Sequence, residues 1–113
     1  MQNEWTLVCQ LEDIPRQGAR VIQRTGMPDV ALFRSVDDQV FALLDRCPHR
    51  GGPLSQGMVI GKKVACPLHN WHIQLENGEA SAPDVGCARR FNVVVEQALV
   101  YLSKTELASL GAE

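Results

Sequence analysis

Cys47-Pro48-His49 and Cys66-Pro67-Leu68-His69 are the two segments that decide how this chain folds and what it holds. Each segment pairs a thiol with an imidazole, and each is expected to form a loop of its own. The two prolines and the Gly51-Gly52 pair favour stiff, tightly turned loops whose backbone can approach a bound group. The pattern therefore predicts a metal site with Cys47, His49, Cys66 and His69 as its ligands.

A [2Fe–2S] cluster of the Rieske type uses this donor set, because two histidines replace two cysteines on one of its irons. The spacing lets each loop offer its cysteine to one iron and its histidine to the other. Structural zinc is an alternative, but zinc fingers favour a knuckle of two cysteines followed by two histidines, whereas each knuckle here is mixed. A disulfide framework fits less well, because the chain begins Met1-Gln2-Asn3-Glu4-Trp5, without the basic and apolar regions of an export signal.

Length and charge narrow the range of functions. A chain of 113 residues is expected to form one domain over residues 1–113, with no room for a separate nucleotide-binding fold. The formal net charge of −2 argues against nucleic acid as a partner. No apolar run approaches the roughly 18 residues that cross a membrane. We therefore expect a cytoplasmic protein that contacts neither nucleic acid nor a membrane.

Short stretches of alternating polar and apolar residues predict strands over most of the chain. Their expected ranges are 5–11, 19–24, 30–36, 39–44, 62–65, 71–75, 91–95 and 98–102. Asn77-Gly78 is the strongest hairpin-turn dipeptide, whereas Glu96-Gln97 supplies neither glycine nor asparagine for a primed turn. Ser103 and Glu106 fit a capping box. The sequence thus predicts an all-β fold, a small antiparallel sandwich or barrel with two metal-binding loops at one end and a short C-terminal helix.

A set of segments spread over nearly the whole chain carries a family resemblance. The set comprises Trp5, Asp13-Ile14-Pro15, Gly18, residues 30–34 and 39–42, Cys66-Pro67-Leu68-His69-Asn70-Trp71, Asn77-Gly78-Glu79-Ala80 and Gly86-Cys87. Together with the metal motif, these segments resemble the Rieske family, and within it the small subunit of the cytosolic NAD(P)H-dependent assimilatory nitrite reductase. Some small subunits of this branch lack the metal ligands, and this chain keeps all four.

The resemblance implies a Rieske-type fold and a division of labour. A large subunit would hold flavin, a [4Fe–4S] cluster and sirohaem, take hydride from NAD(P)H and reduce nitrite to ammonium. This chain would be the electron-transfer subunit with the [2Fe–2S] cluster, and would add a one-electron relay, a structural contact, or both. We do not expect the isolated chain to catalyse a reaction by itself, since it offers no catalytic arrangement of carboxylates or of a nucleophile and a base.

Two other functions stay open. A free-standing Rieske ferredoxin that feeds a ring-hydroxylating dioxygenase would share the fold and the cluster. A non-redox interaction module would bind zinc at the same ligands or leave the site empty. Stable binding of this chain to a much larger protein would favour the nitrite reductase subunit over the free ferredoxin. A brown-red purified protein would exclude the zinc-bound module, because zinc sites are colourless.

Residues beside the two loops suggest smaller roles. His72 could act as an alternate ligand or tune the cluster, but a polar residue on the strand that leaves the second loop is the simpler interpretation. Arg46 and Arg50 are either ordinary solvated charges or a basic rim for docking. Trp71 is either a packing wedge or part of an electron path.

The two cysteines outside the motif are interpreted as packed thiols. Cys9 shares an alternating face with Trp5, Leu7 and Leu11, which predicts a buried and inert side chain. Cys87 follows the loop Ala82-Pro83-Asp84-Val85-Gly86, which in related folds packs over the cluster. A packed Cys87 is preferred over one that tunes the cluster.

Overall fold

The computed structural model describes residues 4–47, 52–67, 71–82 and 85–108. These residues form ten strands in three antiparallel sheets, with one short α-helix near the end of the chain. The molecule measures 40 × 31 × 20 Å along its principal axes. The predicted all-β fold with a short C-terminal helix is confirmed. No helix in the described ranges has the length and apolar character needed to cross a membrane.

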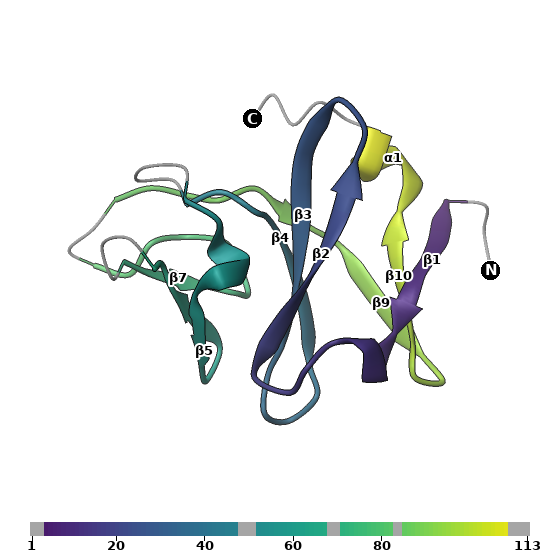
Figure 1. Cartoon of the computed structure of the whole chain (residues 1–113), viewed down its shortest axis with the longest axis horizontal. Helices are drawn as coiled ribbons and strands as arrows, with labels where there is room; N and C mark the ends of the chain where they lie inside the picture. Colours follow the sequence, from purple (N-terminus) through teal and green to yellow (C-terminus); the bar gives the residue numbers. More distant parts are fainter. Residues whose placement is uncertain (1–3, 48–51, 68–70, 83–84, 109–113) are drawn as a thin grey trace.

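The three sheets stand side by side along the long axis of the molecule (Figure 1). The first has the order β1 (Trp5–Gln10), β10 (Leu99–Ser103), β9 (Val93–Glu96). The central sheet has the order β2 (Gly18–Arg24), β3 (Met27–Arg34), β4 (Val40–Leu44), β8 (Arg90–Phe91). The third has the order β5 (Met58–Ile60), β6 (Lys63–Ala65), β7 (His72–Gln74). Two 3₁₀ helices span Leu11–Asp13 and Leu54–Gln56, and α1 spans Lys104–Ala108.

The central sheet is buried on both faces. Val30, Ala31, Leu32 and Phe33 of β3 are all fully buried. Val30 and Leu32 belong to the core shared with the first sheet, whereas Ala31 and Phe33 belong to the core shared with the third. This explains why β3 is a continuous apolar run, since a strand covered on both sides has no polar face.

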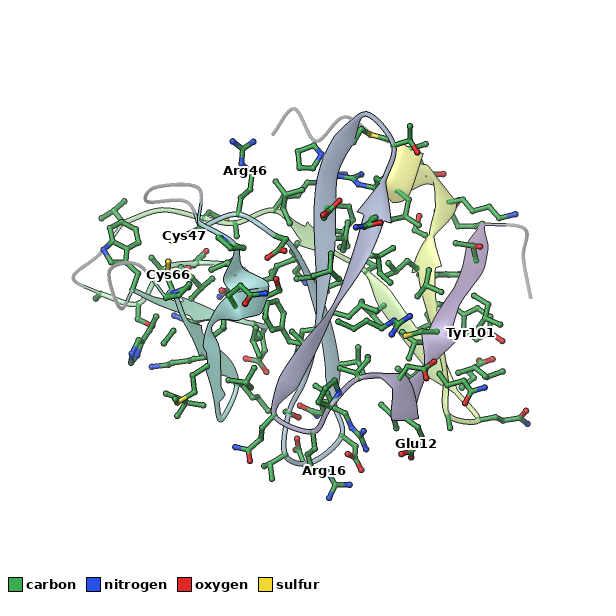
Figure 2. The ribbon with its side chains drawn as sticks, viewed as in Figure 1. Glu12, Arg16, Arg46, Cys47, Cys66 and Tyr101 are labelled. Carbon is green, nitrogen blue, oxygen red and sulfur yellow. The ribbon has the colours of Figure 1, made fainter. Side chains whose placement is uncertain are left out.

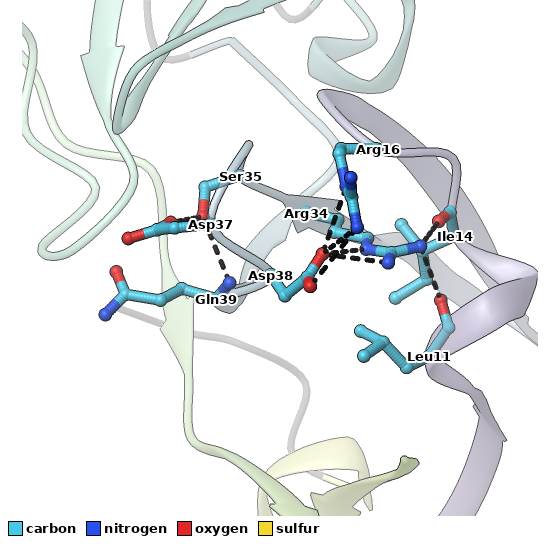
Figure 3. A network of polar contacts seen from close by, with 8 residues as sticks. All are labelled: Leu11, Ile14, Arg16, Arg34, Ser35, Asp37, Asp38 and Gln39. Carbon is cyan, nitrogen blue, oxygen red and sulfur yellow. Dashed lines mark hydrogen bonds and ion pairs between the residues drawn. The ribbon is translucent and has the colours of Figure 1, made fainter.

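A polar network fixes the first 3₁₀ helix to the central sheet (Figure 3). Arg34 is buried, with 6% of the residue exposed, and its guanidinium donates to the carbonyl oxygens of Leu11 at 3.3 Å and Ile14 at 2.9 Å. The same guanidinium forms an ion pair of 2.8 Å with Asp38, which also accepts hydrogen bonds from Arg16. The hydrogen bond from Arg34 is the main reason why the pKa of Asp38 is lowered.

Two hairpin turns differ in how well their residues suit the backbone conformation. Leu75 to Gly78 form a four-residue turn between Gln74 and Glu79, closed by a 2.8 Å bond from the Gln74 N–H to the Glu79 oxygen. Gly78 has φ +77°, and a Cβ there would lie 2.1 Å from the Ala88 oxygen, so the turn needs glycine. In the last hairpin, Gln97 and Ala98 both have positive φ, as a primed turn demands, although neither is glycine.

Two local predictions are wrong. The alternating face of the first strand is interrupted by a bulge between Leu7 and Cys9, and the extra residue turns Leu7 outward, where it is 54% exposed. The capping box is only half formed. The Ser103 hydroxyl accepts the Glu106 N–H at 3.3 Å, but the Glu106 carboxylate accepts two bonds of 2.7 Å from Asn92.

Candidate metal centre

Each metal loop is closed at its base by the backbone of its own cysteine. The Cys47 N–H donates to the Gly52 oxygen at 2.7 Å, and the Cys66 N–H donates to the Trp71 oxygen at 2.6 Å. In both loops the acceptor lies five positions after the cysteine. The two loops are therefore pinched in the same way, and each pinch holds a cysteine at the foot of the loop.

Both of these thiols are buried and lie at the same end of the molecule. Cys47 and Cys66 are each 2% exposed and belong to one core cluster with Leu54, Val64 and Ile73. Figure 2 shows them close together where the two loops begin. All four cysteines of the chain are thiols, so no disulfide consumes this pair.

The paired thiols fit the predicted donor set. Two thiolates brought together from separate loops can bind one iron, and each loop carries a histidine for the second iron. His49 and His69 lie outside the described residues, so their positions stay a prediction. When bound, the [2Fe–2S] cluster accepts and releases a single electron.

Asp45, a carboxylate beside the first loop, makes contacts that its sequence pattern did not predict. Asp45 lies two positions before Cys47, and both of its oxygens accept hydrogen bonds of 2.7 Å from Ser55. In sequence, the only signal is an acidic residue before the first ligand and a serine after the Gly-Gly-Pro-Leu stretch.

The described residues 71–82 and 85–88 follow the second loop. Isolated bridges join Ile73 to Ala80 and Glu79 to Cys87, so this segment folds back on β7. The prediction that Cys87 is packed is wrong, because the residue is exposed. Its Sγ donates a weak hydrogen bond of 3.8 Å to the Asn77 oxygen. The turn at Gly78 brings the backbone at Ala88 inside and leaves the neighbouring thiol in solvent.

The remaining predictions for single residues have mixed outcomes. Trp71 is half-buried and packs against the core that holds the two cysteines, which supports the packing wedge. His72 lies half-buried on β7, opposite Ala65, as the simpler interpretation expected. Arg46 is exposed and projects away from Cys47 (Figure 2), whereas Arg50 lies outside the described residues.

Cys9 confirms the prediction of a buried thiol at the opposite end of the molecule. It is 8% exposed in the core between the first and central sheets. Burial is the main cause that raises the pKa of this thiol, which keeps it protonated and unreactive at neutral pH.

Comparisons with known proteins give the family. The Rieske [2Fe-2S] domain family matches residues 4–96. A relative from Photorhabdus laumondii, the 3-phenylpropionate/cinnamic acid dioxygenase ferredoxin subunit, is 36% identical over 101 residues, which cover 88% of this chain and 93% of the relative. Other relatives are longer: the chain spans only 26% of the 4beta-methylsterol monooxygenase of Methylococcus capsulatus, at 36% identity over 99 residues.

Solved structures with the same fold include members of two functional groups. One is a chain in a complex of reduced oxygenase and oxidised ferredoxin of carbazole 1,9a-dioxygenase, with a TM-score of 0.78 and 29% identity, covering 90% of this chain and 94% of that one. Another is provisionally named the small subunit of an NADPH nitrite reductase, with a TM-score of 0.75 and 27% identity, covering 87% of this chain and 96% of that one. The chain belongs to the Rieske [2Fe-2S] domain family, and a Rieske-type [2Fe–2S] cluster is its cofactor.

Proposed function

We propose that this chain is the small electron-transfer subunit of a cytoplasmic NAD(P)H-dependent nitrite reductase. The single observation that carries the proposal is the segment around the second loop. Pro67 and Trp71 of the Pro-Leu-His-Asn-Trp stretch flank that loop, and the segment from the Asn-Gly turn to Gly86-Cys87 folds back on β7. The similarity to the provisionally named nitrite reductase small subunit, which this chain covers almost completely, supports the same assignment.

In this proposal Cys47 and Cys66 hold one iron of the cluster, and His49 and His69 hold the other. The buried base of each loop, where Cys47 and Cys66 are each 2% exposed, keeps water away from the thiolates. Electrons would pass between this cluster and a large subunit that carries flavin, a [4Fe–4S] cluster and sirohaem. The reaction itself, nitrite to ammonium, belongs to that large subunit.

The outer face of the third sheet also suits a subunit that stays bound. Met58 and Ile60 of β5 are 67% and 50% exposed, whereas Val59 between them is 3% exposed. In this proposal, the large subunit covers these two side chains of the edge strand.

The test is reconstitution with the large subunit. The large subunit alone should lose much of its NAD(P)H-driven nitrite reduction, and adding this chain should restore it. Cys66→Ser should fold and bind without restoring turnover if the cluster relays electrons, and should restore turnover if the subunit only organises the complex. Cys9→Ser is the matched control, because it replaces a buried thiol in the other core.

A second candidate function is a ferredoxin that delivers electrons to an aromatic-ring oxygenase. The relative with 36% identity is a dioxygenase ferredoxin subunit of nearly the same length, and this observation favours the candidate. A ferredoxin would stay monomeric when purified with its partners and would support oxygenase turnover. Failure to bind the large subunit, together with electron transfer to an oxygenase component, would replace the first proposal with this one.

A further inference from the structure

The two metal loops are held in different ways by the fold. The second loop joins β6 to β7, which are paired neighbours, with Ala65 opposite His72. Strand pairing therefore fixes both ends of that loop. The first loop joins β4 of the central sheet to β5 of the third sheet, and these two strands share no ladder. The Cys47–Gly52 bond closes the base of the first loop, but no strand pairing holds β4 and β5 at a fixed separation.

Asp45 and Ser55 supply a tie between β4 and β5. Asp45 directly follows β4, and Ser55 lies in the 3₁₀ helix that leads into β5. The Ser55 N–H donates to Oδ1 of Asp45 at 2.7 Å, and the Ser55 hydroxyl donates to Oδ2 at 2.7 Å. Both contacts are partly buried and charge-assisted, the class of hydrogen bond that stabilises most.

Each end of this tie is itself anchored. On the side of the central sheet, the Asp45 N–H donates to the Asp29 oxygen at 2.9 Å. On the other side, Gly57 lies two positions after Ser55 and packs directly against β6. A Cβ at Gly57 would lie 2.0 Å from the Ala65 oxygen. Ala65 precedes Cys66, so the contacts run without a break from the foot of the first loop to the foot of the second.

We infer that Asp45 and Ser55 are positioning residues for the cluster: their paired hydrogen bonds hold the central and third sheets at the separation at which the two loops can share one [2Fe–2S] unit. The inference rests on the proposed ligand set, but not on which partner receives the electron. Asp45 lies two positions before Cys47, so the two residues act through the backbone at the foot of the first loop.

Three variants of the isolated protein test the inference, with loss of the visible absorption of the cluster to a chelator as the measurement. Ser55→Ala, which keeps one of the two bonds, should lose its cluster about tenfold faster than the wild type, the lower end of the effect of mutating residues that support metal ligands. Asp45→Ala should lose it faster still. Asp45→Asn keeps both contacts as neutral hydrogen bonds, because its amide can donate to the Ser55 oxygen, and should lie near the wild type.

Non-additivity and spectroscopy make the test specific. The double variant Asp45→Ala/Ser55→Ala should be no worse than Asp45→Ala, since both changes remove the same tie. The paramagnetic signal of the reduced cluster should broaden in Asp45→Ala, because the loops are no longer held at one separation. If Asp45→Ala does not fold, Ser55→Ala and Asp45→Asn decide.

Glu4→Ala is the matched control. The Glu4 carboxylate, like that of Asp45, accepts two hydrogen bonds, here from the hydroxyls of Ser103 and Thr105 beside the first sheet. Wild-type loss rates in Asp45→Ala and Ser55→Ala would overturn the inference. Equal acceleration by Glu4→Ala would overturn it too, since loss would then follow global stability. A wrong ligand set is distinguishable, because the wild type would then lack the Rieske signal before any variant is compared.

Discussion

Replacing Gly57 by alanine is expected to separate the third sheet from the 3₁₀ helix that packs on it. Gly57 has φ −83°, which any residue can adopt, so the substitution creates no backbone strain of its own. The added Cβ would lie 2.0 Å from the Ala65 oxygen and 3.0 Å from its carbonyl carbon. Carbon and oxygen atoms normally stay about 3.3 Å apart, so the two backbones must move apart by more than 1 Å.

The cost follows from what lies next to this contact. A movement of that size falls on the three residue pairs that join β5 to β6, beginning with Met58 and Ala65. Overpacking of this kind costs about 1–3 kcal/mol, and the upper part of this range applies because both sides of the clash are backbone. For a domain of this size, about 2–3 kcal/mol corresponds to a fall of roughly 8–13 °C in Tm.

The assay is thermal and urea unfolding of Gly57→Ala beside Gly26→Ala. Gly26 has φ +73° and no atom within 4 Å of an added Cβ, so its variant carries only the left-handed backbone cost of about 1 kcal/mol. Gly57→Ala should be the less stable of the two and should also bind less cluster. A Gly57→Ala protein as stable as Gly26→Ala would refute the steric argument.

Three further changes have expected outcomes. Cys66→Ser should abolish the reduced-state paramagnetic signal, because a hydroxyl replaces a thiolate poorly; electron paramagnetic resonance checks this. Ala98→Gly should stabilise the protein to urea by about 0.5–1 kcal/mol, since Ala98 has φ +64°. Arg34→Met should cost about 1–2 kcal/mol by removing the guanidinium donor from the Ile14 oxygen and one of two donors from the Leu11 oxygen, which still accepts the Ile14 N–H at 3.1 Å. It should also flatten the acid dependence of stability: the lowered pKa of Asp38 stabilises the fold above its ordinary value of 3.8, and this contribution is lost as the pH falls through the lowered pKa.

Each of these outcomes has a clear contrary result. An unchanged spectrum in Cys66→Ser would remove Cys66 from the ligand set. Ala98→Gly with unchanged or lower stability would mean that the turn carries no left-handed strain. An Arg34→Met protein that unfolds in acid as the wild type does would mean that Asp38 keeps its lowered pKa without the guanidinium.

The sequence predicted most of what the local chain chemistry controls. The apolar run Val30–Phe33 and the Asn77-Gly78 dipeptide each indicate one structure, and both form it. The two mixed pairs of Cys and His predicted the [2Fe–2S] cluster, because few other metal sites use this donor set in this spacing. Leu7 was misplaced because a bulge reverses the faces of a strand without any signal in its polar and apolar pattern.

Tertiary contacts account for what the sequence could not give. Asp45 and Ser55 meet only because two sheets do, and nothing in their spacing distinguishes them from other acidic and hydroxyl residues. The Glu106 carboxylate does not complete its capping box, because it accepts two hydrogen bonds from Asn92 on a neighbouring segment. Cys87 faces solvent because the chain reverses at Gly78 and turns Ala88 inward, a geometry set by the close approach of two backbones.

The half of the molecule that holds the cluster depends on the other half and on the cofactor. Strands β5, β6 and β7 have three residues each, the lower end of the usual range of about 3–10 residues. Their inward side chains Val59, Val64 and Ile73 are buried in the same core as Phe33 and Leu43 of the central sheet. A metal unit that joins both loops adds its binding free energy to this arrangement, because the site does not exist in the unfolded chain. Besides the cluster, the contacts at Asp45 and at Gly57 hold the two loops in place. These contacts therefore decide how far the site is already formed before iron and sulfide bind.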